Sequence, residues 1–157
     1  MSEPSIINAV AQSGLFGGLP AEFVDFLATH ARSRQLAKDH VLFHYGQKAD
    51  HFYLITKGRI SIEVAALEGP TLELQELGPG ATVGWSWLIA PHRWSFQARA
   101  LAPTELIEFD GTAVLARCES DPAFGYAVLK RFSTLMSERL HSARQRMMEE
   151  WSPPGFA

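Results

Sequence analysis

The sequence has very little cysteine and no long apolar run. Cys118 is the only cysteine among 157 residues, which excludes an internal disulfide and fits a reducing compartment. No apolar stretch approaches the length needed to cross a bilayer. Residues 1–14 also lack the basic region and apolar core of a secretion signal. We therefore expect a cytoplasmic protein without a membrane-spanning segment.

An excess of positive charge is also missing. The 14 Lys and Arg residues are outnumbered by 17 Asp and Glu residues, for a formal net charge of −3. Bulk electrostatics therefore give no reason to expect contact with nucleic acid, and we predict no specific binding of DNA.

Patterns typical of metal sites and active sites are absent as well. His40 and His44 lie about 13 Å apart along one predicted strand, at ~3.3 Å per residue, and cannot share an ion unaided. His44 and His51 could meet across a turn, but no cysteine or acidic cluster joins them. Cys118 has no base partner in the sequence, as is typical of a structural thiol. With no nucleophile elbow or P-loop either, we expect no metal site and no enzyme.

The middle of the chain carries the signals of many short β-strands. Residues 33–110 hold short runs rich in Val, Ile, Phe, Tyr and Thr, separated by Gly, Pro and Asp. Such runs, spaced roughly 8–12 residues apart, predict a sandwich or a barrel. The predicted strands are Val41–Tyr45, His51–Thr56, Arg59–Ala65, Thr71–Leu77, Ser95–Ala102 and Thr104–Asp110.

Helical signals flank these strands on both sides. We predict short helices over Ser2–Gly14 and Pro20–Ala31, and another over Gly111–Arg117. Asp121-Pro122 combines an N-cap residue with a first-turn proline, and the helix that starts there runs to about Trp151. We expect a single domain with N-terminal helices in 1–32, a β-barrel in 33–110 and C-terminal helices in 111–151.

One side of the last predicted helix is apolar, and at about 45 Å the helix outreaches a barrel of this size. The barrel should cover the first part of this apolar stripe, and a second copy of the chain should cover the rest. We therefore expect a homodimer, the alternative being a monomer whose helix folds back or frays after about Leu140. The predicted interface residues are Leu129, Phe132, Met136, Leu140, Ala143 and Met147.

Three of the four tryptophans fall within Val83–Ala100. This stretch follows the turn signal Gly78-Pro79-Gly80, and Gly84 allows a sharp turn or a close backbone approach. One helical turn after Gly84 would present amide N–H groups that attract an anion, and Arg93 and Arg99 could add a guanidinium. The stretch thus indicates an anion-sized pocket with aromatic walls. The alternative is a Trp-rich corner of the core with two solvated arginines.

A pattern of hairpins and glycine turns runs from about Leu15 to Leu140. Its residues are Leu15-Phe16, Leu19-Pro20, Val41-Leu42-Phe43, Gly46, Phe52-Tyr53-Leu54-Ile55, Gly58, Ile60, Val64 and Leu77-Gly78-Pro79-Gly80. This pattern resembles the cyclic-nucleotide-binding domain of catabolite activator proteins, protein kinase regulatory subunits and cyclic-nucleotide-gated channels. The resemblance implies a mainly β fold, a double-stranded β-helix of jelly-roll type with N-terminal helices and a long C-terminal helix.

The resemblance places the family's phosphate-binding cassette at Gly84–Ala100, with two departures. The family usually has a glutamate for the ribose 2′-hydroxyl, but here Trp85 follows the glycine and cannot accept a hydrogen bond. A lost charged hydrogen bond costs roughly 1.5–3 kcal/mol, so we expect weakened affinity. The family's phosphate-binding arginine falls on Trp94, with Arg93 one residue earlier in a loop and Ser95 offering a hydroxyl.

The resemblance implies a small regulatory sensor domain that binds a small anionic ligand, with cAMP and cGMP as candidates, and signals to an unknown partner. The alternative is an interaction or dimerisation module whose pocket is plugged by Trp85 and Trp94. Activators of this family carry a helix-turn-helix after the long helix; since only Ser152–Ala157 follow here, we expect no DNA-binding output. The predicted ligand-binding residues are Val83, Gly84, Trp85, Ser86, Trp87, Arg93, Trp94 and Ser95.

Overall fold

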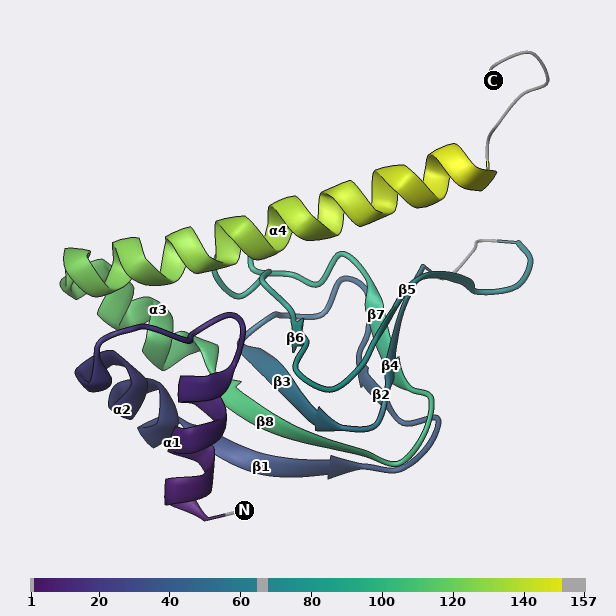
Figure 1. Ribbon diagram of the computed structural model, residues 1–157. Helices are drawn as coiled ribbons and strands as arrows, with labels where there is room; N and C mark the ends of the chain where they lie inside the picture. Colours follow the sequence, from purple (N-terminus) through teal and green to yellow (C-terminus); the bar gives the residue numbers. More distant parts are fainter. Residues whose placement is uncertain (1, 65–67, 151–157) are drawn as a thin grey trace.

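The computed structural model describes residues 2–64 and 68–150, and two four-stranded antiparallel sheets form its centre (Figure 1). The first sheet has the strand order β1-β8-β3-β6 and the second β2-β7-β4-β5. The strands are β1 (Ala31–Leu36), β2 (Val41–Phe43), β3 (His51–Lys57), β4 (Ile60–Val64), β5 (Leu72–Leu77), β6 (Thr82–Val83), β7 (Gln97–Ala100) and β8 (Thr104–Asp110). Most neighbours in each sheet are distant in sequence, as the jelly-roll prediction requires.

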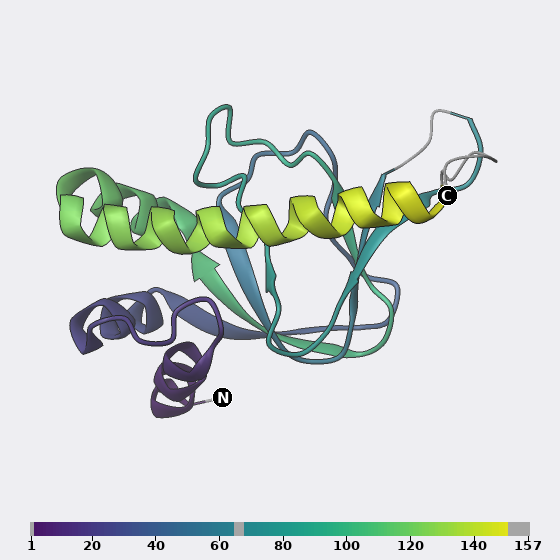
Figure 2. The ribbon, with the colours of Figure 1, turned by 45° about the horizontal axis from the view of Figure 1, so that its top comes forward.

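Four helices accompany the sheets in the described part of the chain: α1 (Glu3–Gln12), α2 (Ala21–Thr29), α3 (Gly111–Ser120) and α4 (Pro122–Glu150). The predicted start of α4 is confirmed, because the Asp121 carboxylate accepts a hydrogen bond from the Phe124 amide. Figure 2 shows α4 running the length of the molecule, with α1 and α2 gathered at one end. None of these helices is both long and apolar enough to cross a bilayer. The predicted end at Trp151 lies outside the described residues.

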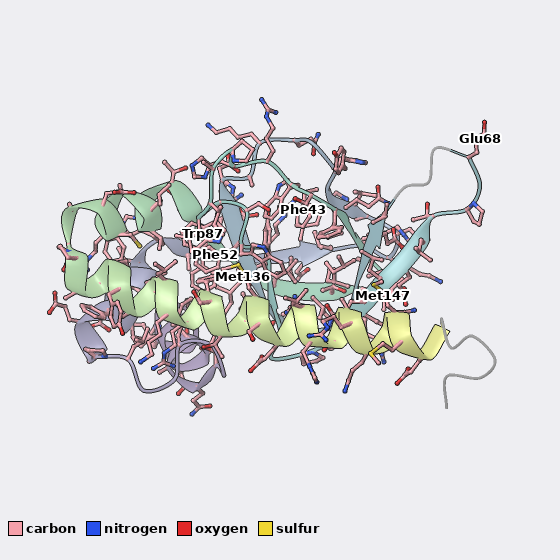
Figure 3. The ribbon with its side chains drawn as sticks, turned by 90° about the horizontal axis from the view of Figure 1, so that it is seen from above. Phe43, Phe52, Glu68, Trp87, Met136 and Met147 are labelled. Carbon is pink, nitrogen blue, oxygen red and sulfur yellow. The ribbon has the colours of Figure 1, made fainter. Side chains whose placement is uncertain are left out.

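A cluster of aromatic rings attaches α4 to the first sheet. Phe52 of β3 stacks on Phe109 of β8 and on Trp87, with ring centroids 4.6 Å apart in both pairs. Phe132 of α4 meets Phe52 and Trp87 edge-on, at 5.3 and 5.1 Å, and Phe16 packs against Phe52, Phe109 and Phe132. All five rings are buried. Figure 3 shows Trp87 and Phe52 beside α4.

Strand β1 was not predicted from the sequence, and Ala31 was wrongly assigned to the preceding helix. The reason is its composition, because ARSRQL lacks the apolar alternation that marks a half-buried strand. Instead, Arg32 and Arg34 donate hydrogen bonds of 2.7 and 2.6 Å to the buried Glu108 of β8. These ion pairs take the place of cross-strand apolar contacts at this edge of the sheet.

Replacing Phe132 with alanine should destabilise the protein by about 3–5 kcal/mol, because the substitution leaves a cavity beneath α4. Tyr126→Ala on the same helix is the control, since Tyr126 is 68% exposed and should cost far less. Urea unfolding followed by circular dichroism measures both. Equal losses of stability would show that α4 is not anchored through Phe132.

Candidate ligand-binding site

A cavity of about 370 Å³ lies between the second sheet, the segment after β6 and α4. Phe43 and Ile62 line it from the strands, Gly84–Ser86 and Trp94–Phe96 from two loops, and Met136 from α4. Its volume falls within the roughly 300–1,000 Å³ of small-molecule sites. The cavity is open beside Trp85 and Trp94, and this argues against the alternative in which those rings plug it.

The predicted binding residues divide between this cavity and other surroundings. Gly84, Trp85, Ser86, Trp94 and Ser95 all line the cavity, as the sequence hypothesis requires of binding residues.

The remaining predicted residues do not line it. Trp87 is a core residue, because it is 1% exposed and lies in the aromatic cluster. Val83 of β6 is buried and pairs with Tyr53 of β3. Arg93 is exposed and donates a hydrogen bond of 2.9 Å to the Gly46 carbonyl. The expected inward reach of Arg93 is therefore not observed, because Arg93 forms a β-bridge with Lys48 in the loop between β2 and β3.

Gly84 and Trp94 are packed so closely that only glycine fits. The backbone of Gly84 has a φ of +96°, and a Cβ atom there would lie 2.6 Å from the Trp94 ring. Trp94 in turn stacks on Phe43, with centroids 3.7 Å apart and planes 9° from parallel. Trp94 thus forms a flat wall of the cavity.

Arg99 was the other arginine predicted as a partner for an anion, and it forms its ion pairs outside the cavity. Its guanidinium pairs with Glu63 at 2.7 Å and with Asp39 at 3.0 Å. Burial by itself would raise the pKa of Glu63, but hydrogen bonds from Arg99, Gln97 and Ser61 hold that pKa below its usual value. Arg99 therefore neutralises a buried carboxylate in the second sheet.

The cavity receives its arginines from α4. Arg139 is half-buried, donates a hydrogen bond to the Thr82 carbonyl, and places its guanidinium 6.0 Å from the centre of the Trp85 ring. Desolvation by burial lowers the pKa of Arg139 to about 10. Arg146 lies two turns further along and donates a hydrogen bond of 2.8 Å to the Leu74 carbonyl. Neither arginine was predicted to face the cavity, although they lie seven and fourteen residues after the buried Phe132, a spacing that places all three on nearly the same face of a helix.

The predicted interface stripe on α4 is split by the fold. Phe132 is fully buried in its own chain, so it cannot contact a second copy. Met136 is half-buried in the cavity wall. Leu129, Leu140 and Met147 remain 49%, 64% and 69% exposed, and Leu140 and Ala143 also line the cavity.

Substituting Gly84 with alanine should destabilise the protein more than substituting Gly80, which has a similar φ of +88° but open space around it. Both variants incur about 1–2 kcal/mol for a left-handed backbone. Gly84→Ala alone must also displace Trp94, for about 1–3 kcal/mol more. Thermal and urea unfolding measure the difference, and equal stabilities would contradict the close contact.

Comparisons with known proteins identify the family of this chain. The family model of the cyclic nucleotide-binding domain matches residues 33–121. The cyclic AMP receptor protein of Thermus thermophilus is 28% identical over 131 residues, which are 83% of this chain and 59% of that protein. The chain thus spans less than two thirds of that relative's length.

Solved structures show the same fold. A cyclic nucleotide-binding domain from Methylobacillus flagellatus has a TM-score of 0.78 at 22% identity, covering 95% of this chain and 84% of that one. The catabolite activator protein of Thermus thermophilus has a TM-score of 0.68 at 27% identity, covering 85% of this chain and 61% of that one. With the family model matching more than half of its length, the chain belongs to the cyclic nucleotide-binding domain family.

Proposed function

We propose that this chain is a regulatory sensor domain, without catalytic activity, that binds a small anionic ligand in the cavity between the β-barrel and α4. The observation that carries the proposal is the open cavity beside Gly84, where the resemblance to the family places its cassette. Because α4 forms one wall, the position of the helix depends on what the cavity holds. The ligand signal would pass to an output partner through that helix.

Cyclic AMP and cyclic GMP are the first ligands to test, since a related protein is named a cyclic AMP receptor. The hydroxyls of Ser86 and Ser95 at the cavity wall could bond to a phosphate. Trp85 cannot accept the ribose hydroxyl, however, and Arg93 donates elsewhere. We therefore expect an affinity well below that of a domain with the complete cassette.

A millimolar concentration of cyclic AMP or cyclic GMP should raise the melting temperature, because a ligand that binds only the folded state stabilises it by mass action. Isothermal titration calorimetry gives the matching heat of binding. Ser86→Trp, which fills the cavity, is the control and should abolish both signals. The absence of heat and of thermal shift with both nucleotides would reject them as ligands.

The exposed apolar side chains of α4 also support a homodimer. Leu129, Leu140 and Met147 follow one side of the helix and are exposed. Pairing two such helices about a two-fold axis would bury both strips at once. Leu140 belongs to the strip and to the cavity wall, so a partner helix would lie next to the ligand.

Placing glutamate at both Leu129 and Met147 should shift the protein from dimer to monomer, because each charge would be buried at the interface. Neither residue lines the cavity. Ser137→Glu, on an exposed side of the same helix, is the control. Sedimentation velocity at micromolar concentration distinguishes the two states, and a wild-type protein that sediments as a monomer would overturn the dimer.

A further inference from the structure

The cavity is walled mainly by flat and apolar side chains. The rings of Trp85, Trp94, Phe43 and Phe96 line it, together with Ile62 and other aliphatic side chains. Trp94 and Phe43 are already stacked on one another, so they present a rigid face. A flat ring system gains binding free energy from offset or edge-to-face contact with such a wall. A ribose instead needs polar partners for its hydroxyl groups.

Arg139 places a positive charge within this apolar wall. In the described ranges 2–64 and 68–150 no carboxylate forms an ion pair with it, and it donates a hydrogen bond to the neutral carbonyl of Thr82. A guanidinium has five N–H donors in a planar fork that matches a carboxylate. Burial lowers the pKa of Arg139, and the negative charge of Glu138 opposes this only in part.

The other charged groups near the cavity have partners of their own. Glu76 at the wall pairs with Arg59. Arg146 lies on an exposed part of α4 and is held by the Leu74 carbonyl. Arg93 and Arg99 lie outside the lining. The half-buried charge that a ligand in the cavity can neutralise is therefore Arg139.

We propose that the ligand is a flat, largely apolar monoanion of the aromatic carboxylate class, with its ring against Trp85 and Trp94 and its carboxylate on Arg139 of α4. This inference rests on the proposed function, namely that the cavity is a ligand site, and adds the chemistry of the ligand and the residue that recognises it. The anion contact comes from the helix and not from the cassette loop.

Binding of this kind changes the contacts of α4. A carboxylate adds the attraction of an opposite charge to its hydrogen bonds with a guanidinium, which the neutral Thr82 carbonyl cannot offer. The carboxylate of the ligand therefore competes with the Thr82 carbonyl for Arg139. Occupation of the cavity then weakens the direct hydrogen bond between α4 and β6 and replaces it with a contact through the ligand.

The test uses β-naphthoate and its neutral counterpart β-naphthylmethanol, titrated calorimetrically into the full chain. We expect the acid to bind more tightly than the alcohol. Arg139→Gln should lower the affinity for naphthoate by about tenfold or more, which is the equivalent of one charge-assisted hydrogen bond. The affinity for the alcohol should change by less than about twofold. Arg144→Gln, exposed on the same helix, should bind both probes like the wild type.

Two further variants keep the outcome decisive. Arg139→Lys keeps the positive charge but loses the planar fork of the guanidinium. This variant should still bind naphthoate more tightly than the alcohol, with a lower affinity for naphthoate than the wild type has. It replaces Arg139→Gln if circular dichroism shows that the Gln variant is unfolded. Arg93→Gln should leave naphthoate binding unchanged. A loss of naphthoate binding in Arg93→Gln, with none in the Arg139 variants, would assign the anion to the cassette loop and overturn the inference.

The outcomes separate this inference from the proposed function. Equal binding of acid and alcohol would overturn the role of Arg139 while leaving the cavity as a ligand site. Binding of a cyclic nucleotide but not of naphthoate would overturn the aromatic carboxylate and support the sensor function. Failure of both probes and of both cyclic nucleotides would reject the cavity as a ligand site and this inference with it.

Discussion

The stacking of Phe52, Phe109 and Trp87 beneath Phe132 is the contact on which the site depends. It joins three parts of the chain, namely the first sheet, the loop after Gly84 and the long helix. Each aromatic pair contributes about 0.5–1.5 kcal/mol beyond the burial of its surface. Trp87 continues the loop that forms one wall of the cavity, and Phe132 lies on the helix that forms another. Their edge-on contact therefore sets the spacing of those walls.

The close contact of Gly84 with Trp94 gives the cavity its chemistry. With no Cβ at Gly84, the indole can lie flat against the backbone and on Phe43. The resemblance places an aromatic plate where the family carries a phosphate-binding arginine. The family fold is thus present while the wall of this cavity is largely aromatic, in keeping with the way a few side chains on a common scaffold determine a site.

Much of the fold could be predicted from local signals in the sequence. Glycine turns separated short runs rich in Val, Ile, Phe, Tyr and Thr, and Asp121-Pro122 marked the start of α4. Strand β1 was missed because charge pairing with Glu108 replaces its apolar alternation. The place of the cavity could also be predicted, since the tryptophans cluster around Gly84. The separate environments of the tryptophans could not be predicted, because Trp85 in the cavity wall and Trp87 in the core lie on opposite sides of the same turn.

Arg93 is near the cassette in sequence but bonds to the Gly46 carbonyl in the loop between β2 and β3, whereas Arg139 is distant in sequence and reaches the cavity through the docking of α4. The sequence does carry a signal for Arg139, because it lies seven residues after Phe132, close to two helical turns, and so shares that residue's face of the helix. An interpretation that counted only apolar residues in the stripe missed this signal. The docking of Phe132 against the aromatic cluster directs the same face toward the cavity.

Phe132 anchors α4 about a third of the way along the helix, so more of the helix extends beyond this anchor than precedes it. Arg139 lies about 10 Å along the axis from Phe132, and Glu150 about 27 Å, at 1.5 Å per residue. If the helix tilts as a rigid rod about its aromatic anchor, a shift at Arg139 is roughly 2.5 times larger at Glu150. The proposed exchange of one hydrogen bond at Arg139 would then move the end of the helix further than it moves the arginine itself.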